Sequence, residues 1–418
     1  PDSLDALINT GLLYQKLNHL ADAELYLKRA VEIDGNSAVA LFALADIYEQ
    51  GNAYDKSIEL YDKLTKVLPD DAEVAMKIAG IYILKKDYIS AKKCLSKAKE
   101  KFPKNQWIDY YFGLLFVEEK DYKTAIKHFD MSISLGKKLQ APHIQKGYIF
   151  TIQNDTKKAI KSFEKAVSLG TKIPDVYFFL AMNYEVTGDY RKSEDMLKKA
   201  IEIEPLNSRY RFELGVVCDK LSKQECMESE FFKAIEIDSN SAQAYNYLGY
   251  SYADKNIKLD KAEELVKKAI EIEPENPAYI DSLGWVYYRL AKYTEALSLL
   301  KMASEKIDDH EIFDHLGDCY LTLGDVQKAV DSWELSLAID KNKDVKKKVK
   351  KYQKSLKWSR DMIMERGVRS FKGIRDISGF VNAATVYKND GYGVSGPFFF
   401  KKPKQLRFEI LGLFSGHQ

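Results

Sequence analysis

Cysteine is scarce in this sequence: its 418 residues include only Cys94, Cys218, Cys226 and Cys319. They form no Cys-x-x-Cys pair, and no histidine accompanies them at the spacing of a zinc site. Cys218 and Cys226 fall in successive helices of one expected hairpin, so they can approach each other. We interpret the cysteines as buried free thiols, which act as small hydrophobic residues. A disulfide would matter mainly in an exported protein.

Signatures of catalysis are missing as well. The sequence has no glycine-rich phosphate-binding loop, no Gly-x-Ser-x-Gly motif and no His-Glu-x-x-His motif. His310 and His315 lie among acidic residues, but an i, i+5 spacing is poor for two ligands on one helical face. We interpret them as solvated helix residues rather than as a metal site. The sequence therefore predicts a protein that is not an enzyme, with no catalytic residue, metal or cofactor.

Long apolar runs and a strong overall charge are also lacking. No stretch reaches the 18 or so apolar residues of a transmembrane helix. The net charge is only +2, so we expect no binding to nucleic acid. Charge is uneven, however, because residues 341–366 contain eleven basic and three acidic residues. The chain starts at Pro1 without a signal-peptide pattern, and we expect that the natural N-terminus and any targeting segment are cut away.

What the sequence does contain is a 34-residue period. An aromatic residue, or once cysteine, lies three residues after each member of a series of small residues. This series consists of Gly11, Ala45, Ala79, Gly113, Gly147, Ala181, Gly215, Gly249, Gly284 and Gly317. A fixed period of this length is typical of a stacked solenoid. Glycine inside a helix costs about 1 kcal/mol relative to alanine, so its repeated use at one position indicates a steric need.

The stretch from Pro174 to Asn207 illustrates one unit. Apolar residues from Tyr177 to Tyr184 recur at i, i+3, i+4 and i+7, which predicts one face of a helix. Gly188 and Asp189 interrupt the pattern and indicate a tight turn. A second amphipathic run follows and contains Met196, Leu197, Ala200, Ile201 and Ile203. One such hairpin cannot bury its own apolar face, so neighbouring units must stack.

The sequence resembles tetratricopeptide repeats over residues 4–343, in ten units. Pro69, Pro103, Pro205 and Pro274 occupy the proline position of that family, while the tryptophan common near the start of its first helix is replaced. The resemblance implies an all-α, right-handed superhelical solenoid of about ten helical hairpins with a concave groove. We therefore expect residues 1–343 to form this solenoid.

The resemblance also implies that positions 2, 5, 9 and 12 of each first helix line the groove. The candidate partner-binding residues are Met76, Trp107, Tyr110, Leu114, Ile144, Tyr148, Phe178, Met182, Phe212, Tyr250, Trp285 and Tyr288. A groove with this apolar and aromatic lining favours a peptide, an amphipathic helix or a hydrophobic segment as ligand. The alternative is that several of these side chains pack between adjacent first helices as ordinary core.

The end of the chain differs in kind. Residues 344–366 predict a lysine-rich amphipathic helix, which we interpret as a cap on the solenoid, the alternative being contact with anionic lipid or an acidic partner. Residues 367–418 alternate in the manner of β-strands, with a turn at Asn389-Asp390-Gly391. Residues 370–416 resemble the opening of a bacterial lipoprotein carrier or receptor of the Lol type, which predicts a short antiparallel β segment of an incomplete domain.

We expect a non-enzymatic scaffold that binds a protein or peptide in its concave groove. The terminal resemblance favours a role in bacterial envelope assembly or trafficking, in the periplasm or at the outer membrane, with peripheral membrane or lipoprotein contact through residues 344–418. One alternative is a lipoprotein- or lipid-handling protein that acts through the terminal β domain. Another is a cytoplasmic assembly co-chaperone, for which the terminal segment is dispensable.

Overall fold

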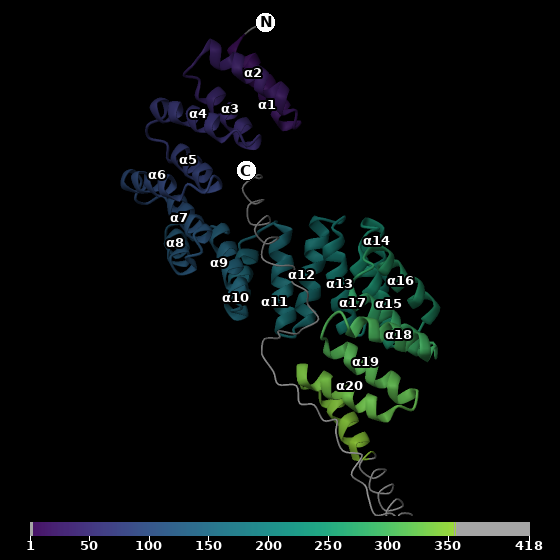
Figure 1. Cartoon of the computed structure of the whole chain (residues 1–418). Helices are drawn as coiled ribbons and strands as arrows, with labels where there is room; N and C mark the ends of the chain where they lie inside the picture. The colour runs from purple at the N-terminus through teal and green to yellow at the C-terminus, as the bar shows by residue number, and fades with distance from the viewer. Residues whose placement is uncertain (1–2, 355, 357–418) are drawn as a thin grey trace, which may run out of the picture. The chain divides into compact units, whose positions relative to one another are not determined.

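The computed structural model describes residues 3–354 and 356, and all the regular secondary structure of these residues is helical (Figure 1). The prediction of an all-α chain is confirmed over this range. The β segment predicted at residues 367–418 lies outside the described residues. None of the described helices combines the length and the apolar character needed to cross a membrane.

The helices form two compact units, which divide between Pro205 and Leu206. The first unit contains α1 (Leu4–Lys16), α2 (Leu20–Ile33), α3 (Ala38–Gln50), α4 (Tyr54–Val67), α5 (Ala72–Leu84), α6 (Tyr88–Lys101), α7 (Gln106–Glu118), α8 (Tyr122–Leu135), α9 (Ala141–Ile152), α10 (Thr156–Ser168), α11 (Pro174–Val186) and α12 (Tyr190–Ile203).

The second unit contains α13 (Ser208–Lys220), α14 (Gln224–Ile237), α15 (Ala242–Asp254), α16 (Leu259–Ile272), α17 (Pro277–Arg289), α18 (Tyr293–Ser304), α19 (His310–Thr322) and α20 (Val326–Ile339). A further helical run spans 343–354. Within each unit, the odd-numbered helices are the first helices of successive hairpins and the even-numbered ones are the second helices. Each helix packs against its hairpin partner, and each second helix except the last of its unit also packs against the first helix of the next hairpin.

The hairpin of α11 and α12 shows how the sequence pattern produces the fold. Leu180 and Ala181 of α11 are buried, as the predicted helical face requires. Gly188 has φ +77°, a left-handed conformation that glycine adopts without steric cost. The Asp189 side chain then accepts a hydrogen bond from a backbone N–H in the first turn of α12. Ile203, which the pattern placed on the apolar face, is instead 41% exposed.

The small residues of the period lie where two helices of a hairpin approach most closely. A Cβ atom on Gly113 would overlap the ring of Phe129, and one on Gly147 would overlap the ring of Phe163. In the second unit, a Cβ on Gly317 would overlap the indole of Trp333. The predicted steric need is therefore confirmed: a glycine on the first helix makes room for a large ring on the second.

The helical run at 343–354 covers the end of the last hairpin. The Asn342 side chain accepts hydrogen bonds from the backbone N–H groups of Asp344 and Val345, which caps the start of this helix. Val345 and Val349 are buried in a cluster that includes Trp333 of α20. The lysine-rich segment thus places an apolar stripe on the solenoid.

Two of the cysteines are joined. Cys218 on α13 and Cys226 on α14 form a disulfide with a Cα–Cα distance of 5.8 Å, so the interpretation as free thiols is wrong for this pair. The geometry of the hairpin brings the two cysteines together. Their spacing in the sequence did not decide whether they are bonded. Cys94 and Cys319 are free, and burial raises the pKa of each thiol to about 11. Thiols with so high a pKa are poor nucleophiles at neutral pH.

Candidate functional site

The twelve residues proposed for the groove are distributed over both units and differ in exposure. Seven are buried: Met76, Leu114, Ile144, Tyr148, Phe178, Phe212 and Trp285. Five are partly exposed: Trp107, Tyr110, Met182, Tyr250 and Tyr288. Buried side chains pack mainly against their own chain, so the partly exposed residues are the better placed for direct contact; Trp285 is buried but also lines a cavity.

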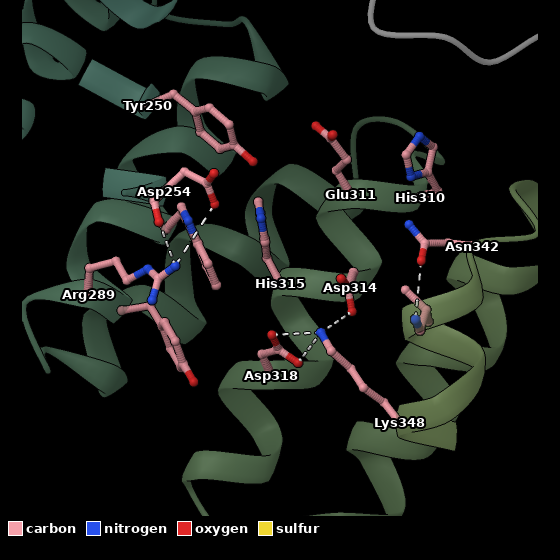
Figure 2. Close-up of a pocket in the computed structure, with 13 residues that line it drawn as sticks. Tyr250, Asp254, Arg289, His310, Glu311, Asp314, His315, Asp318, Asn342 and Lys348 are labelled. Atoms are coloured by element: carbon pink, nitrogen blue, oxygen red, sulfur yellow. Dashed lines mark hydrogen bonds and ion pairs between the residues drawn. The ribbon is translucent and has the colours of Figure 1, made fainter. Parts of the chain in front are cut away.

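Three of the twelve residues converge on one cavity in the second unit. Tyr250 of α15 and Trp285 and Tyr288 of α17 line a cavity of about 370 Å³ (Figure 2). The remaining wall comes from α19 and from the start of the terminal helix. First helices of successive hairpins pack side by side here, so residues about one repeat apart face the same space.

The cavity has an aromatic wall. The Trp285 indole stacks on the His315 ring, with centroids 4.1 Å apart, and on the Tyr288 ring, with centroids 4.9 Å apart. The Arg289 guanidinium lies 4.7 Å from the Trp285 ring centroid, a favourable cation–π distance. The Tyr250 ring lies 6.1 Å from that of His315. The rings and the guanidinium thus pack against one another.

Acidic groups on one first helix pair with basic groups one repeat later. Arg289 donates to the backbone carbonyl of Asp254 at 2.9 Å, with its carboxylate at 3.9 Å. His315 Nδ1 lies 3.0 and 3.1 Å from the two carboxylate oxygens of the buried Asp281. Burial disfavours protonation of His315, but the Asp281 carboxylate outweighs it and the pKa of His315 is raised.

The terminal helix continues this pairing. Lys348 donates to the carboxylates of Asp314 and Asp318, with all three N–O distances between 2.7 and 2.8 Å. Burial lowers the pKa of Lys348, yet the two carboxylates prevail and the net pKa is raised. Figure 2 shows Lys348 reaching across from the terminal helix to α19. This face of α19 therefore already binds one ammonium group.

Glu311 is an exception to the pairing of acids with bases one repeat later. The residue 34 positions later is Val345, which carries no charge, and no ion pair of Glu311 occurs among the described residues. Glu311 is exposed at the rim of the cavity. Loss of hydration at its carboxylate is the main cause of a raised pKa, to which the charge of Asp281 adds and which His315 opposes. A carboxylate in this state favours a nearby cation.

Tyr250 faces Glu311 across the cavity (Figure 2). Burial raises the pKa of Tyr250 well above its usual value, and the charges of Glu311, Asp281 and Asp254 add to this effect. The hydroxyl group therefore stays protonated and is available as a hydrogen-bond donor or acceptor.

Two N–H groups in the cavity wall have no acceptor. Trp285 Nε1 and Arg289 Nε are buried and make no hydrogen bond to any described residue. A buried donor without a partner costs roughly 1–3 kcal/mol. In this wall, the two buried polar groups without a hydrogen-bond partner among the described residues therefore both lie on α17.

The structure corrects one expectation about the histidines and adds residues that sequence reasoning missed. His315 is only 7% exposed, so the interpretation as a solvated residue is wrong for this side chain. The candidate site residues predicted from the sequence did not include its partner Asp281, nor Arg289 and Lys348. Acid–base pairs separated by 34 or 35 residues were the available signal, because that spacing matches the repeat.

A second cavity, of about 430 Å³, lies in the first unit between α6, α7 and α8. The fully buried Asp109 carboxylate contacts Lys99 and lies 3.5 Å from His128 Nδ1. Burial raises the pKa of Asp109, but these two basic groups overcome it and the net pKa is lowered. Because Lys99 already pairs with this carboxylate, we regard the cluster as structural.

Comparison with protein families identifies the repeats. Residues 15–81, 142–169 and 174–205 match family models described as tetratricopeptide repeat. Residues 255–334, which include most of the cavity, match the model described as anaphase-promoting complex, cyclosome, subunit 3. The matched segments fall in both units.

Similar proteins cover only part of the chain. A TPR repeat-containing protein of Pseudomonas aeruginosa is 35% identical over 115 residues, which are 28% of this chain and 19% of that protein. Anaphase-promoting complex subunit 3 of Schizosaccharomyces pombe is 28% identical over 109 residues, 26% of this chain and 16% of that protein. This chain thus spans less than a fifth of either relative.

A solved structure shows the same fold. A tetratricopeptide repeat protein from Parabacteroides merdae aligns with a TM-score of 0.51 and 17% identity, covering 59% of this chain and 98% of that one. Together with the 34-residue period, the helical hairpins and the matched family models, this likeness leads to one conclusion. The chain is built from tetratricopeptide repeats.

Proposed function

We propose that the chain is a protein-interaction scaffold that binds a segment of a partner protein on its first-helix surface, with the cavity between α15, α17 and α19 as the principal contact. The observation that carries this proposal is the convergence of Tyr250, Trp285 and Tyr288 on one cavity. Clefts lined by aromatic side chains with a few convergent polar groups are typical binding sites.

The proposal extends to the first unit with a narrower set of residues. Trp107, Tyr110 and Met182 are partly exposed there and remain candidates for contact with an apolar segment. The Trp107 and Tyr110 rings meet edge to face, with centroids 5.5 Å apart. Trp107 and Tyr110 pack against the apolar cluster that contains the buried Met76 and Leu114.

Site-specific photocrosslinking tests the proposal. A photoreactive amino acid at Thr322, an exposed residue whose hydroxyl lies 3.0 Å from that of Tyr288, should trap the partner next to the cavity. The matched control is the same amino acid at Met302, which is 41% exposed on the second helix α18. The trapped protein is identified by mass spectrometry and its purified form is titrated. Equal trapping at both positions would contradict the proposal.

The disulfide bears on the cellular setting. Disulfides form and persist in oxidising compartments, so the Cys218–Cys226 bond favours the bacterial envelope over the cytoplasm for this scaffold. Thiol alkylation in intact cells, with and without prior reduction, measures the state of the pair. We expect alkylation of Cys226 only after reduction. A freely alkylated Cys226 without reduction would rule out this setting.

A second candidate function is the handling of a lipoprotein or lipid through residues 367–418. The strand-like sequence pattern of this segment favours it. It predicts that a chain ending at residue 366 loses its activity. The scaffold proposal predicts the opposite, because the cavity lies wholly within residues 250–348. Photocrosslinking from Thr322 in the shortened chain separates the two.

A further inference from the structure

The cavity in the second unit is short of a positive charge. Four carboxylates line it, those of Asp254, Glu311, Asp314 and Asp318, against the cations of Arg289 and Lys348 and the imidazoles of His310 and His315, of which His315 is paired with Asp281. Both cations already have partners: Arg289 donates to the backbone carbonyl of Asp254, and Lys348 donates to the carboxylates of Asp314 and Asp318. The local charge therefore favours an incoming cation.

Glu311 marks the place where this cation is missing. Along the same face, Asp254, Asp281 and Asp314 each meet a basic residue 34 or 35 positions later in the chain. Glu311 meets Val345 at the corresponding position, and Val345 is 98% buried in the apolar cluster of the terminal helix. The regular ladder between repeats thus leaves Glu311 without a basic residue one repeat later, and among the described residues only the imidazoles of His310 and His315, from its own helix, offer it positive charge.

The walls suit a side chain that carries a positive charge. Tyr250 stands opposite Glu311, and Figure 2 shows its hydroxyl directed into the space between them. A cation held over the face of an aromatic ring gains from the ring quadrupole. Lys348, which binds Asp314 and Asp318 on the same helix, is an example within the chain of the chemistry that this face accepts.

A second observation indicates that the occupant also brings acceptors. Trp285 is only 6% exposed, lines the cavity, and has a buried indole N–H without a partner among the described residues. The neighbouring Arg289 Nε is also buried and has no hydrogen-bond partner among the described residues. A simple cation such as a polyamine has no oxygen acceptor, whereas a peptide carries a carbonyl at every residue.

We propose that this cavity receives an arginine or lysine side chain of the bound protein segment, that Glu311 is its counterion, and that backbone carbonyls of the segment accept hydrogen bonds at the Trp285 wall. The inference rests on the proposed function, because it names the chemistry of the partner at the same cavity. It commits to a basic protein segment.

The probe is N-acetyl-arginine methylamide, with N-acetyl-citrulline methylamide as its neutral isostere. The full chain is labelled with ¹⁵N at the indole nitrogens of its four tryptophans, and the Trp285 signal is assigned from the Trp285→Phe variant. We expect a saturable shift of this signal with the arginine compound and none with the citrulline compound. Dissociation constants for a single side chain are expected to be on the order of millimolar.

Glu311→Gln should weaken binding of the arginine compound at least tenfold. The matched control is Glu295→Gln, which removes one exposed carboxylate from α18 and should leave binding unchanged. Helical circular dichroism and the melting temperature show that both variants are folded. Equal shifts with arginine and citrulline, or unchanged affinity in Glu311→Gln, would overturn the inference.

The photocrosslinking experiment distinguishes this failure from failure of the proposed function. If Thr322 traps a partner while the arginine compound does not bind, the scaffold proposal stands and the basic-segment inference is wrong. If Thr322 traps no more than Met302, the scaffold proposal itself fails at this cavity. If Glu311→Gln also weakens binding of the purified partner, both are supported.

Discussion

Single glycines in the first helices control how closely two helices approach. Gly113 faces the Phe129 ring without room for a Cβ atom, while the nearest atom to a Cβ on Gly80 would be the edge of the Tyr111 ring at 3.3 Å. Phe129 is fully buried and cannot swing into solvent without loss of its packing. Overpacking at such a site typically costs about 1–3 kcal/mol.

We therefore expect Gly113→Ala to lower the free energy of unfolding by about 1–3 kcal/mol, although alanine has the better helix propensity. Gly80→Ala, also inside a first helix, should be much closer to neutral because propensity contributes up to about 1 kcal/mol in its favour. Urea unfolding followed by circular dichroism measures both. Similar effects in the two variants would show that packing is not the cause.

The buried pair of His315 and Asp281 makes a second prediction at the residue scale. Removing one partner, as in His315→Gln, leaves the Asp281 carboxylate buried and unpaired, which costs about 3–5 kcal/mol. The double variant with Asp281→Asn should recover much of this loss. A double-mutant cycle by urea unfolding gives the coupling free energy, and additive losses would argue against a pair.

The same pair predicts a pH dependence. His315 is faced by Asp281 from α17 and by Glu311 and Asp314 from its own helix, which together raise its folded-state pKa above 6.5 against the effect of burial. The stabilisation is fully present below about pH 6.5 and disappears as the pH rises through the higher folded-state pKa. Wild-type stability should thus fall over that window. His315→Gln should lack this fall; a parallel decline in the variant would assign it to other groups.

At the scale of elements, the terminal helix stabilises the last hairpin through two valines. Val345 and Val349 are buried beside Trp333, so replacing both by serine should lower the free energy of unfolding of the second unit by a few kcal/mol. The control is Lys346→Ser with Lys350→Ser, which changes exposed residues of the same helix. Thermal unfolding compares them. An equal loss in the control would indicate an effect of helix propensity rather than of packing.

At the scale of the whole molecule, each unit holds its own core. Repeat proteins depend on contacts between neighbouring hairpins rather than on one shared core, so part of a repeat array can fold by itself. We expect a fragment of residues 1–205 to remain helical and to unfold cooperatively in urea. The complementary fragment, 206–418, should also remain helical, unfold cooperatively in urea and retain the cavity. A fragment without a cooperative transition would show that the two units fold only together.

Much of the architecture follows from the sequence because its causes are local and repeated. The small residues and aromatic residues at 34-residue steps define helical hairpins, and turn residues such as Gly188 and Asp189 separate the two helices of a unit. Hydrophobic periodicity depends only on residues a few positions apart. This periodicity can therefore be recognised from the sequence alone.

The candidate site depended on the tertiary structure. Phe178 and Tyr250 were both assigned to the groove, yet the first is fully buried and the second partly exposed. A rotation of one helix position turns a side chain by about 100°, so a repeat pattern alone does not decide which side it faces. The Cys218–Cys226 disulfide and the unpaired Glu311 were likewise decided in three dimensions, because partners meet across hairpins through packing rather than through sequence proximity.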